Sequence, residues 1–158
     1  IEGSMKTELY VATVARTYRK AIDDYFESEE KYRVNMDWYR EEIAKSVHRQ
    51  FSTGFYFGKP DEAAQIYDSS TYVNEYVYLG MAEEVSEDGR IRIEQKNKFC
   101  VGDQIEIMKP DGRNLSVQVL SLTTEDGERV ESAPHARQIL WVELSGRAEK
   151  FDLLRVKK

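Results

Sequence analysis

This chain of 158 residues contains few of the residues that build disulfides and metal sites. Its single cysteine, Cys100, cannot form an internal disulfide or contribute to a site with several cysteines. Its only histidines are His48 and His135, and the zinc-protease pattern HExxH does not occur. The sequence therefore predicts no disulfide, no metal site and no bound cofactor.

Long apolar runs and an excess of positive charge are also missing. No stretch approaches the roughly 20 apolar residues that cross a bilayer, so we expect no membrane insertion. No signal peptide is visible, and together with the single cysteine this favours the cytoplasm. Because the net charge is −6, binding of nucleic acid through charge alone is disfavoured, and any contact with RNA is expected to be local.

The residues that are present favour an ordered chain. Apolar residues make up 41% of the sequence and charged residues 33%, with only three prolines. The length fits one domain, or one small domain with a helical extension. It is enough for the chain to bury its own core.

Helical periodicity runs through the first part of the chain and predicts a helical hairpin over residues 1–48. The first helix, over roughly residues 7–26, carries an apolar stripe formed by Val11, Val14, Tyr18, Ile22 and Tyr25. Arg16 and Lys20 fall elsewhere on this helix. After the polar break ESEEKYRVN, a second helix is expected from Asn35 or Asp37 to about Val47. Such an amphipathic pair is typically packed on a larger unit.

From about Tyr76 the apolar residues alternate instead, which is the period of β-strands. Six short antiparallel strands are predicted over residues 76–158, and in the fourth the apolar phase slips between Val119 and Leu120. Such a slip indicates a bulge or the corner of a barrel. The fold class is therefore α+β, mainly β: a helical hairpin followed by a small antiparallel β-barrel.

The segment HRQFSTGFYFG, residues 48–58, leads into an extended arm that is predicted over residues 49–75. In an extended chain Phe51, Phe55 and Phe57 share one side, and we expect them to pack the hairpin against the barrel. Arg49 and Tyr56 are the more exposed members in this interpretation. They are the candidate substrate-binding residues, because an aromatic ring and a nearby cation can hold single-stranded nucleic acid.

The sequence offers no catalytic constellation. A nucleophilic site needs a base within hydrogen-bond reach of the nucleophile, and neither Cys100 nor either histidine lies in a known nucleophile motif. His135 is interpreted as structural, with its imidazole bonding a nearby carbonyl and fixing the turn after Pro134. No catalytic residue is predicted, and the chain by itself is expected to be inactive.

Several segments together closely resemble the C-terminal part of the proteins of peptidase family U32, often called collagenase-like peptidases. The resemblance runs through IEGSMKTELYVATVARTYRKAIDDY, HRQFSTGFYFGKP, NKFCVGDQIEI and FDLLR, and covers essentially the whole chain. In that family a larger catalytic region precedes a helical hairpin and a small barrel that is similar to domain 2 of translation elongation factors. Residues 1–4 look like the end of that region, although Ser4 replaces the family's arginine, or they are a vector remnant. Cys100 matches none of the family's diagnostic cysteines.

The resemblance implies a partner and leaves the substrate open. The partner is the missing N-terminal catalytic region of the same protein, and the substrate is RNA or protein. Some family members are described as peptidases or collagenases, and others hydroxylate bases of transfer or ribosomal RNA. We therefore expect a non-catalytic accessory module that binds the substrate of a U32 protein. The alternatives are a part of a true peptidase that contributes to proteolysis, and a purely structural cap or oligomerisation domain.

Overall fold

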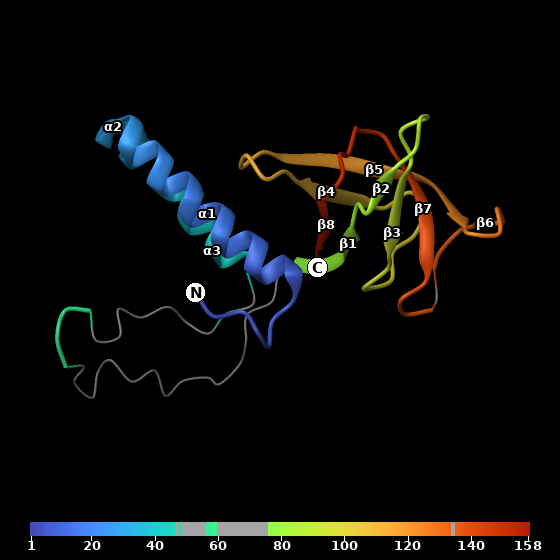
Figure 1. The fold of residues 1–158 in the computed structure, drawn as a ribbon, viewed down its shortest axis with the longest axis horizontal. Coiled ribbons are helices and arrows are strands. Elements are labelled where there is room, and N and C mark those ends of the chain that lie inside the picture. The colour runs from blue at the N-terminus through green and yellow to red at the C-terminus, as the bar shows by residue number, and fades with distance from the viewer. Residues whose placement is uncertain (47, 49–55, 60–75, 134) are drawn as a thin grey trace.

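The computed structural model describes residues 1–46, 48, 56–59, 76–133 and 135–158 (Figure 1). All of its helices lie before residue 48 and all of its strands after residue 75. Within the described residues, none of the helices combines the length and the apolar character that crossing a bilayer requires.

The hairpin contains three helices, one more than the sequence pattern predicts. They are α1 (Glu8–Glu27), α2 (Glu29–Val34) and α3 (Met36–Ala44). The added helix, α2, lies in the polar break. Ser28 separates it from α1: its N–H donates to the Asp24 carbonyl at 2.9 Å, and its hydroxyl accepts from the Lys31 N–H at 3.1 Å.

The apolar stripe of α1 faces mainly away from the barrel, which corrects the expectation that it is the packing face. Tyr18, Ile22 and Tyr25 are 56%, 43% and 49% exposed, and of the predicted stripe only Val14 is buried. Apart from Val14 and Leu9, the buried residues of α1 are polar: Thr13, Arg16, Thr17 and Asp24. The physical reason is that the neighbouring elements offer carbonyl and carboxylate partners, so these polar groups can be buried without losing their hydrogen bonds.

The six predicted strands occur in an antiparallel sheet, together with two strands of two residues each. The strands are β1 (Tyr76–Met81), β2 (Glu84–Val85), β3 (Ile91–Glu94), β4 (Gln104–Met108), β5 (Asn114–Thr124), β6 (Arg129–Val130), β7 (Ile139–Leu144) and β8 (Leu153–Lys157). Their order is β1-β8-β4-β5-β7-β3-β2, with β6 paired to β5. Beyond β3, the Lys96 N–H donates to the Leu79 carbonyl of β1 at 2.9 Å. This bond brings two distant parts of the strand order together, so the sheet curls toward a barrel.

The predicted slip in the fourth long strand is confirmed. The pairing of β5 with β7 shifts register between Val119 and Ser121, and Leu120 is 45% exposed beside the buried Val119. The bulge lets one long strand pair with β4 in its first half and with β7 in its second. The sheet encloses an apolar core whose fully buried members include Leu79, Ile91, Ile93, Phe99, Ile107, Leu122, Leu140 and Leu154. The similarity to domain 2 of elongation factors stays a prediction.

Candidate substrate-binding groove between the hairpin and the barrel

A buried carboxylate joins the hairpin to the barrel. Glu42 of α3 is 1% exposed and is ion-paired with Arg16 of α1. It also accepts hydrogen bonds from Arg155 of β8, at 3.1 and 3.3 Å, and from the Asn114 side chain of β5, at 2.7 Å. Lys45, just after α3, donates to it at 2.5 Å. One side chain therefore holds two helices and two strands in a fixed relation.

The electrostatics of this cluster favour a positive site. Among the residues that the structure describes, Arg155 is paired with Glu42 and with one other carboxylate, Glu106, at 2.5 Å. Arg16, Lys45 and Arg155 thus face two carboxylates, which leaves one unit of positive charge. Burial on its own would raise the pKa of Glu42, but the Lys45 hydrogen bond and the two arginines outweigh it and lower that pKa. The carboxylate stays ionised, and the cluster stays intact, around neutral pH.

Aromatic rings cover the buried cations. The Arg16 guanidinium lies 5.7 Å from the centre of the Trp38 ring, and that of Arg155 lies 5.0 Å from the centre of the Tyr76 ring. Cations attract the faces of such rings, more strongly where water is excluded. These contacts further restrict the position of each guanidinium.

Beside this cluster a groove of about 500 Å³ runs between α1 and the barrel. Its volume is in the range of small-molecule sites. The α1 side is formed by Ala12, Ala15, Arg16 and Arg19, and the barrel side by Met108, Pro110, Phe151 and Leu153. The side chains of the two alanines project little from α1, so the groove remains open to a flat ligand.

Phe151 has an unusual backbone conformation at the barrel side of the groove. Its φ of 75° lies in the left-handed region, which bulky residues rarely adopt and which costs about 1 kcal/mol or more. The Phe151 N–H donates to the Ala82 carbonyl at 2.8 Å, and the next residue, Asp152, is buried and ion-paired with Lys109 at 2.5 Å. The backbone is thereby fixed, while the Phe151 ring is 65% exposed and lies 5.1 Å from the Lys150 ammonium.

The α1 side of the groove also includes a covered polar group without a partner among the described residues. Arg16 is only 7% exposed, and its terminal nitrogens donate to Glu42, to Asn114 and to the Lys109 carbonyl. Its Nε–H has no hydrogen-bond partner among the residues that the structure describes. A buried donor of this kind is costly unless something accepts its hydrogen bond.

A second groove, of about 560 Å³, lies on the hairpin alone. Its lining is mainly apolar and includes Tyr18, Ala21, Tyr32, Met36 and Ile43. Tyr32 stacks on Tyr39, with ring centres 5.6 Å apart. Tyr18 of the exposed α1 stripe lines this groove, whereas Arg16, Lys45 and Arg155 do not.

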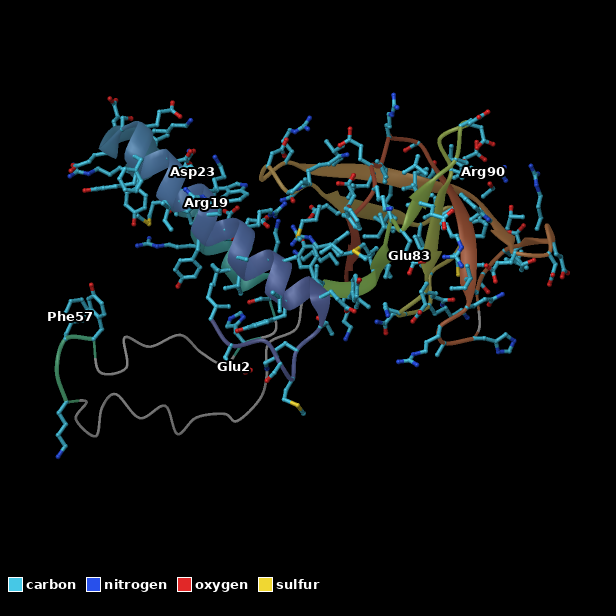
Figure 2. All side chains as sticks on the ribbon, in the orientation of Figure 1. Glu2, Arg19, Asp23, Phe57, Glu83 and Arg90 are labelled. Atoms are coloured by element: carbon cyan, nitrogen blue, oxygen red, sulfur yellow. The ribbon has the colours of Figure 1, made fainter. Side chains whose placement is uncertain are left out.

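The predicted aromatic arm is described only at residues 56–59. Arg49, Phe51 and Phe55 lie outside the described residues. Tyr56 and Phe57 are 85% and 83% exposed, and Figure 2 shows Phe57 away from the helices and the barrel. The expectation that Phe57 is packed is therefore wrong. Residues 56–59 form turns and bends, with Gly58 at a φ of 134°, so the alternation of an extended chain does not apply to them.

The other residues singled out from the sequence lie apart from the groove. His135 is exposed, and its backbone carbonyl accepts from the Gln138 N–H at 3.3 Å. Cys100 is half-buried with a free thiol, and its N–H donates to the Asp103 carboxylate at 2.8 Å. The described part of the chain contains no group of three or more potential metal ligands.

Sequence reasoning missed the residues that form the groove. The helical pattern places Arg16 outside the apolar stripe of α1, and nothing in the spacing of Glu42 and Arg155 indicates that they meet. Phe151 has no local signal either, because a left-handed φ is usually marked by glycine or asparagine. These contacts join residues that are up to 113 positions apart and depend on the tertiary fold.

Comparison with known proteins places the two parts of the molecule in one family. The model of the peptidase family U32 C-terminal domain matches residues 74–155, and the model described as peptidase family U32 matches residues 1–66. The chain belongs to peptidase family U32. The C-terminal domain match covers most of the barrel, and the other match covers the whole hairpin.

Relatives within the U32 family carry different names. The tRNA hydroxylation protein P1 of Bacillus subtilis is 31% identical over 156 residues, which is 98% of this chain and 37% of that protein. An uncharacterized protease of Methanocaldococcus jannaschii is 35% identical over 57 residues, which is 36% of this chain and 14% of that protein. The match therefore spans little more than a third of the B. subtilis protein and about a seventh of the M. jannaschii protein.

A solved structure of a U32 C-terminal domain from Geobacillus thermoleovorans superposes with a TM-score of 0.46. It is 22% identical and covers 51% of this chain and 91% of that one. Membership of the family rests on the sequence matches.

Proposed function

We propose that this chain is the non-catalytic C-terminal module of a U32 protein that hydroxylates transfer RNA, and that it helps to hold the RNA. The observation that carries the proposal is the similarity to the B. subtilis tRNA hydroxylation protein P1 over 98% of this chain. A basis for RNA binding is the positive cluster beside an open groove with an exposed aromatic ring.

The chemistry belongs to the rest of the protein in this proposal. Relatives are about three times as long, so a catalytic region of the same protein is the natural partner of this module. Within the described residues, neither a metal-binding group nor a nucleophile paired with a base is seen. The module would need no cofactor of its own and would work in the cytoplasm, where transfer RNA is used.

A contribution to proteolysis is the second candidate, favoured by the match to the M. jannaschii protease. That match covers only 36% of the chain, so the evidence for RNA is broader. A denatured protein substrate would need an apolar surface, which the hairpin groove offers.

A binding titration separates these functions. We expect the chain to bind an unmodified transfer RNA transcript and to bind denatured collagen much more weakly. Because phosphate contacts release counterions, the affinity for RNA should fall as salt is raised from 50 to 200 mM. Binding to collagen alone would contradict the proposal, and binding to neither would favour a structural cap.

A further inference from the structure

We infer that the groove between α1 and the barrel holds one unpaired nucleotide of the RNA, with its base stacked on Phe151. This inference rests on the proposed function and adds the site, the kind of ligand and the roles of two residues. Its basis is the conformation and exposure of Phe151 and the charges around the groove.

The conformation of Phe151 is difficult to explain by folding alone. Glycine would adopt a φ of 75° without strain, and a polar residue would be better solvated at 65% exposure. Instead the site carries a large ring that contributes little to the core. Strained residues are concentrated at ligand sites, where the surrounding structure fixes them in a useful orientation. A ring exposed beside a groove is suited to stacking on a base, because every base has an aromatic face.

Arg16 lies on the helix side of the groove and, among the described residues, has one unused hydrogen-bond donor. Its Nε–H is without a partner, and Arg16 lines the same groove as Phe151. The ion pair with Glu42 and the hydrogen bond to the Lys109 carbonyl, at 2.8 Å, fix the guanidinium in place. This donor has almost no exposed surface in the structure, so a base carbonyl in the groove would accept from it once the side chains that cover it move aside.

The charges near the groove suit a phosphate at its edge. Lys150 is adjacent to Phe151 and forms no ion pair among the described residues, so its ammonium is available to a phosphate. The carboxylates on this side are already engaged: Asp23 is paired with Arg19, which lies beside it on α1 (Figure 2). Asp152 and Glu149 share Lys109, at 2.5 and 3.4 Å. The buried cluster around Glu42 adds one unit of positive charge. The groove can therefore take an anion although the whole chain is acidic.

The decisive substitution is Phe151→Gly, which removes the ring and relieves the backbone strain at the same time. We expect its melting temperature to equal or exceed that of the unchanged chain. Its Kd for an unmodified transfer RNA transcript, measured by fluorescence anisotropy, should rise about 5- to 100-fold through the loss of one stacked base. Because stacking releases no counterions, the slope of log Kd against log salt should stay unchanged.

Three further variants make the test independent of folding. Phe151→Leu keeps an apolar side chain that cannot stack, and should also weaken binding, whereas Phe151→Trp should retain it. Phe26→Ala removes a ring that is 83% exposed at the far end of α1, and should leave the Kd unchanged.

The outcomes separate the two proposals. If the unchanged chain binds RNA and Phe151→Gly binds it equally well, the groove is not the nucleotide site, although the proposed function stands. If the unchanged chain does not bind RNA, both proposals fail. If denatured collagen is the ligand that Phe151→Gly loses, the groove binds protein and the nucleotide assignment is wrong.

Discussion

The barrel and the hairpin use their apolar residues in opposite ways. In the barrel the alternating positions of the strands face inward and form a core in which Leu79, Ile107 and Leu154 are completely buried. In the hairpin the apolar stripe of α1 is about half exposed, while Arg16 and Glu42 are buried. The barrel is thus stabilised mainly by its own core. The position of the hairpin is set by the buried ion pairs of Glu42 together with a small apolar cluster in which Leu9 of α1 meets Tyr78, Met108 and Leu153 of the barrel. The apolar groove of the hairpin remains uncovered.

The largest effect should come from applying the same substitution in both regions. Phe99→Ala, at a residue 2% exposed in the barrel core, should lower the free energy of unfolding by about 3–5 kcal/mol through lost burial and a cavity. Phe26→Ala in α1, at a residue 83% exposed, should change it by less than about 0.5 kcal/mol. Urea denaturation followed by circular dichroism measures both. Equal losses would show that the hairpin has an apolar core of its own.

Removing one charge at the junction should have the next largest effect. Glu42→Gln keeps the volume but leaves Arg16 and Arg155 without their shared carboxylate, at a cost of about 3 kcal/mol. The loss should be seen first as faster tryptic cleavage within α1 and α3, with the barrel still resistant. Glu41→Gln, at an exposed neighbour, is the matched control. An unchanged cleavage pattern in Glu42→Gln would mean that apolar contacts hold the hairpin.

A smaller effect is expected from acid, and it should arise in the hairpin. Asp24 is buried, which on its own would raise its pKa, but hydrogen bonds from Tyr39, Lys20 and Asn35 lower that pKa to about 2 from an ordinary 3.8. A folded pKa below the unfolded one adds stability above about pH 4, and this stability is lost as the pH falls toward 2. The difference corresponds to about 2 kcal/mol.

Comparison with Asp24→Asn tests this assignment, because the variant should be less stable near neutral pH and lose less stability between pH 4 and 2. Asp23→Asn, at the exposed neighbour paired with Arg19, is the control. If Asp24→Asn and the unchanged chain lose the same stability on acidification, Asp24 is not the group responsible.

The barrel could be predicted from the sequence because the pattern that identifies each strand lies within that strand. Alternation within each strand indicates which side faces the core, and a single slip near Val119 was enough to locate the bulge. The two-residue strands β2 and β6 were missed, since two residues show no period. Helix α2 was missed because charged residues fill it, although Ser28 has the chemistry of a helix cap.

The candidate groove could not be predicted, because the residues that form it are defined by pairing across the chain. The rule that apolar residues are buried placed the wrong side of α1 against the barrel. That rule holds where the neighbouring surface is apolar, but here the Lys109 carbonyl just after β4 and the Asn114 side chain of β5 accept hydrogen bonds from Arg16. The aromatic arm was the most visible motif, yet the described part of it, Tyr56 and Phe57, lies in turns.

Because four side chains share Glu42, few mutations at this junction are expected to be tolerated during evolution. The Glu42 carboxylate accepts hydrogen bonds from Arg16, Arg155, Asn114 and Lys45 at once. A mutation at any one of these positions therefore disturbs the contacts of the others. Single replacements should therefore be eliminated even when they preserve charge, since lysine cannot reproduce the forked contacts of arginine. Among descendants of this chain, Arg16, Glu42 and Arg155 are expected to be inherited as a set, or to be replaced together.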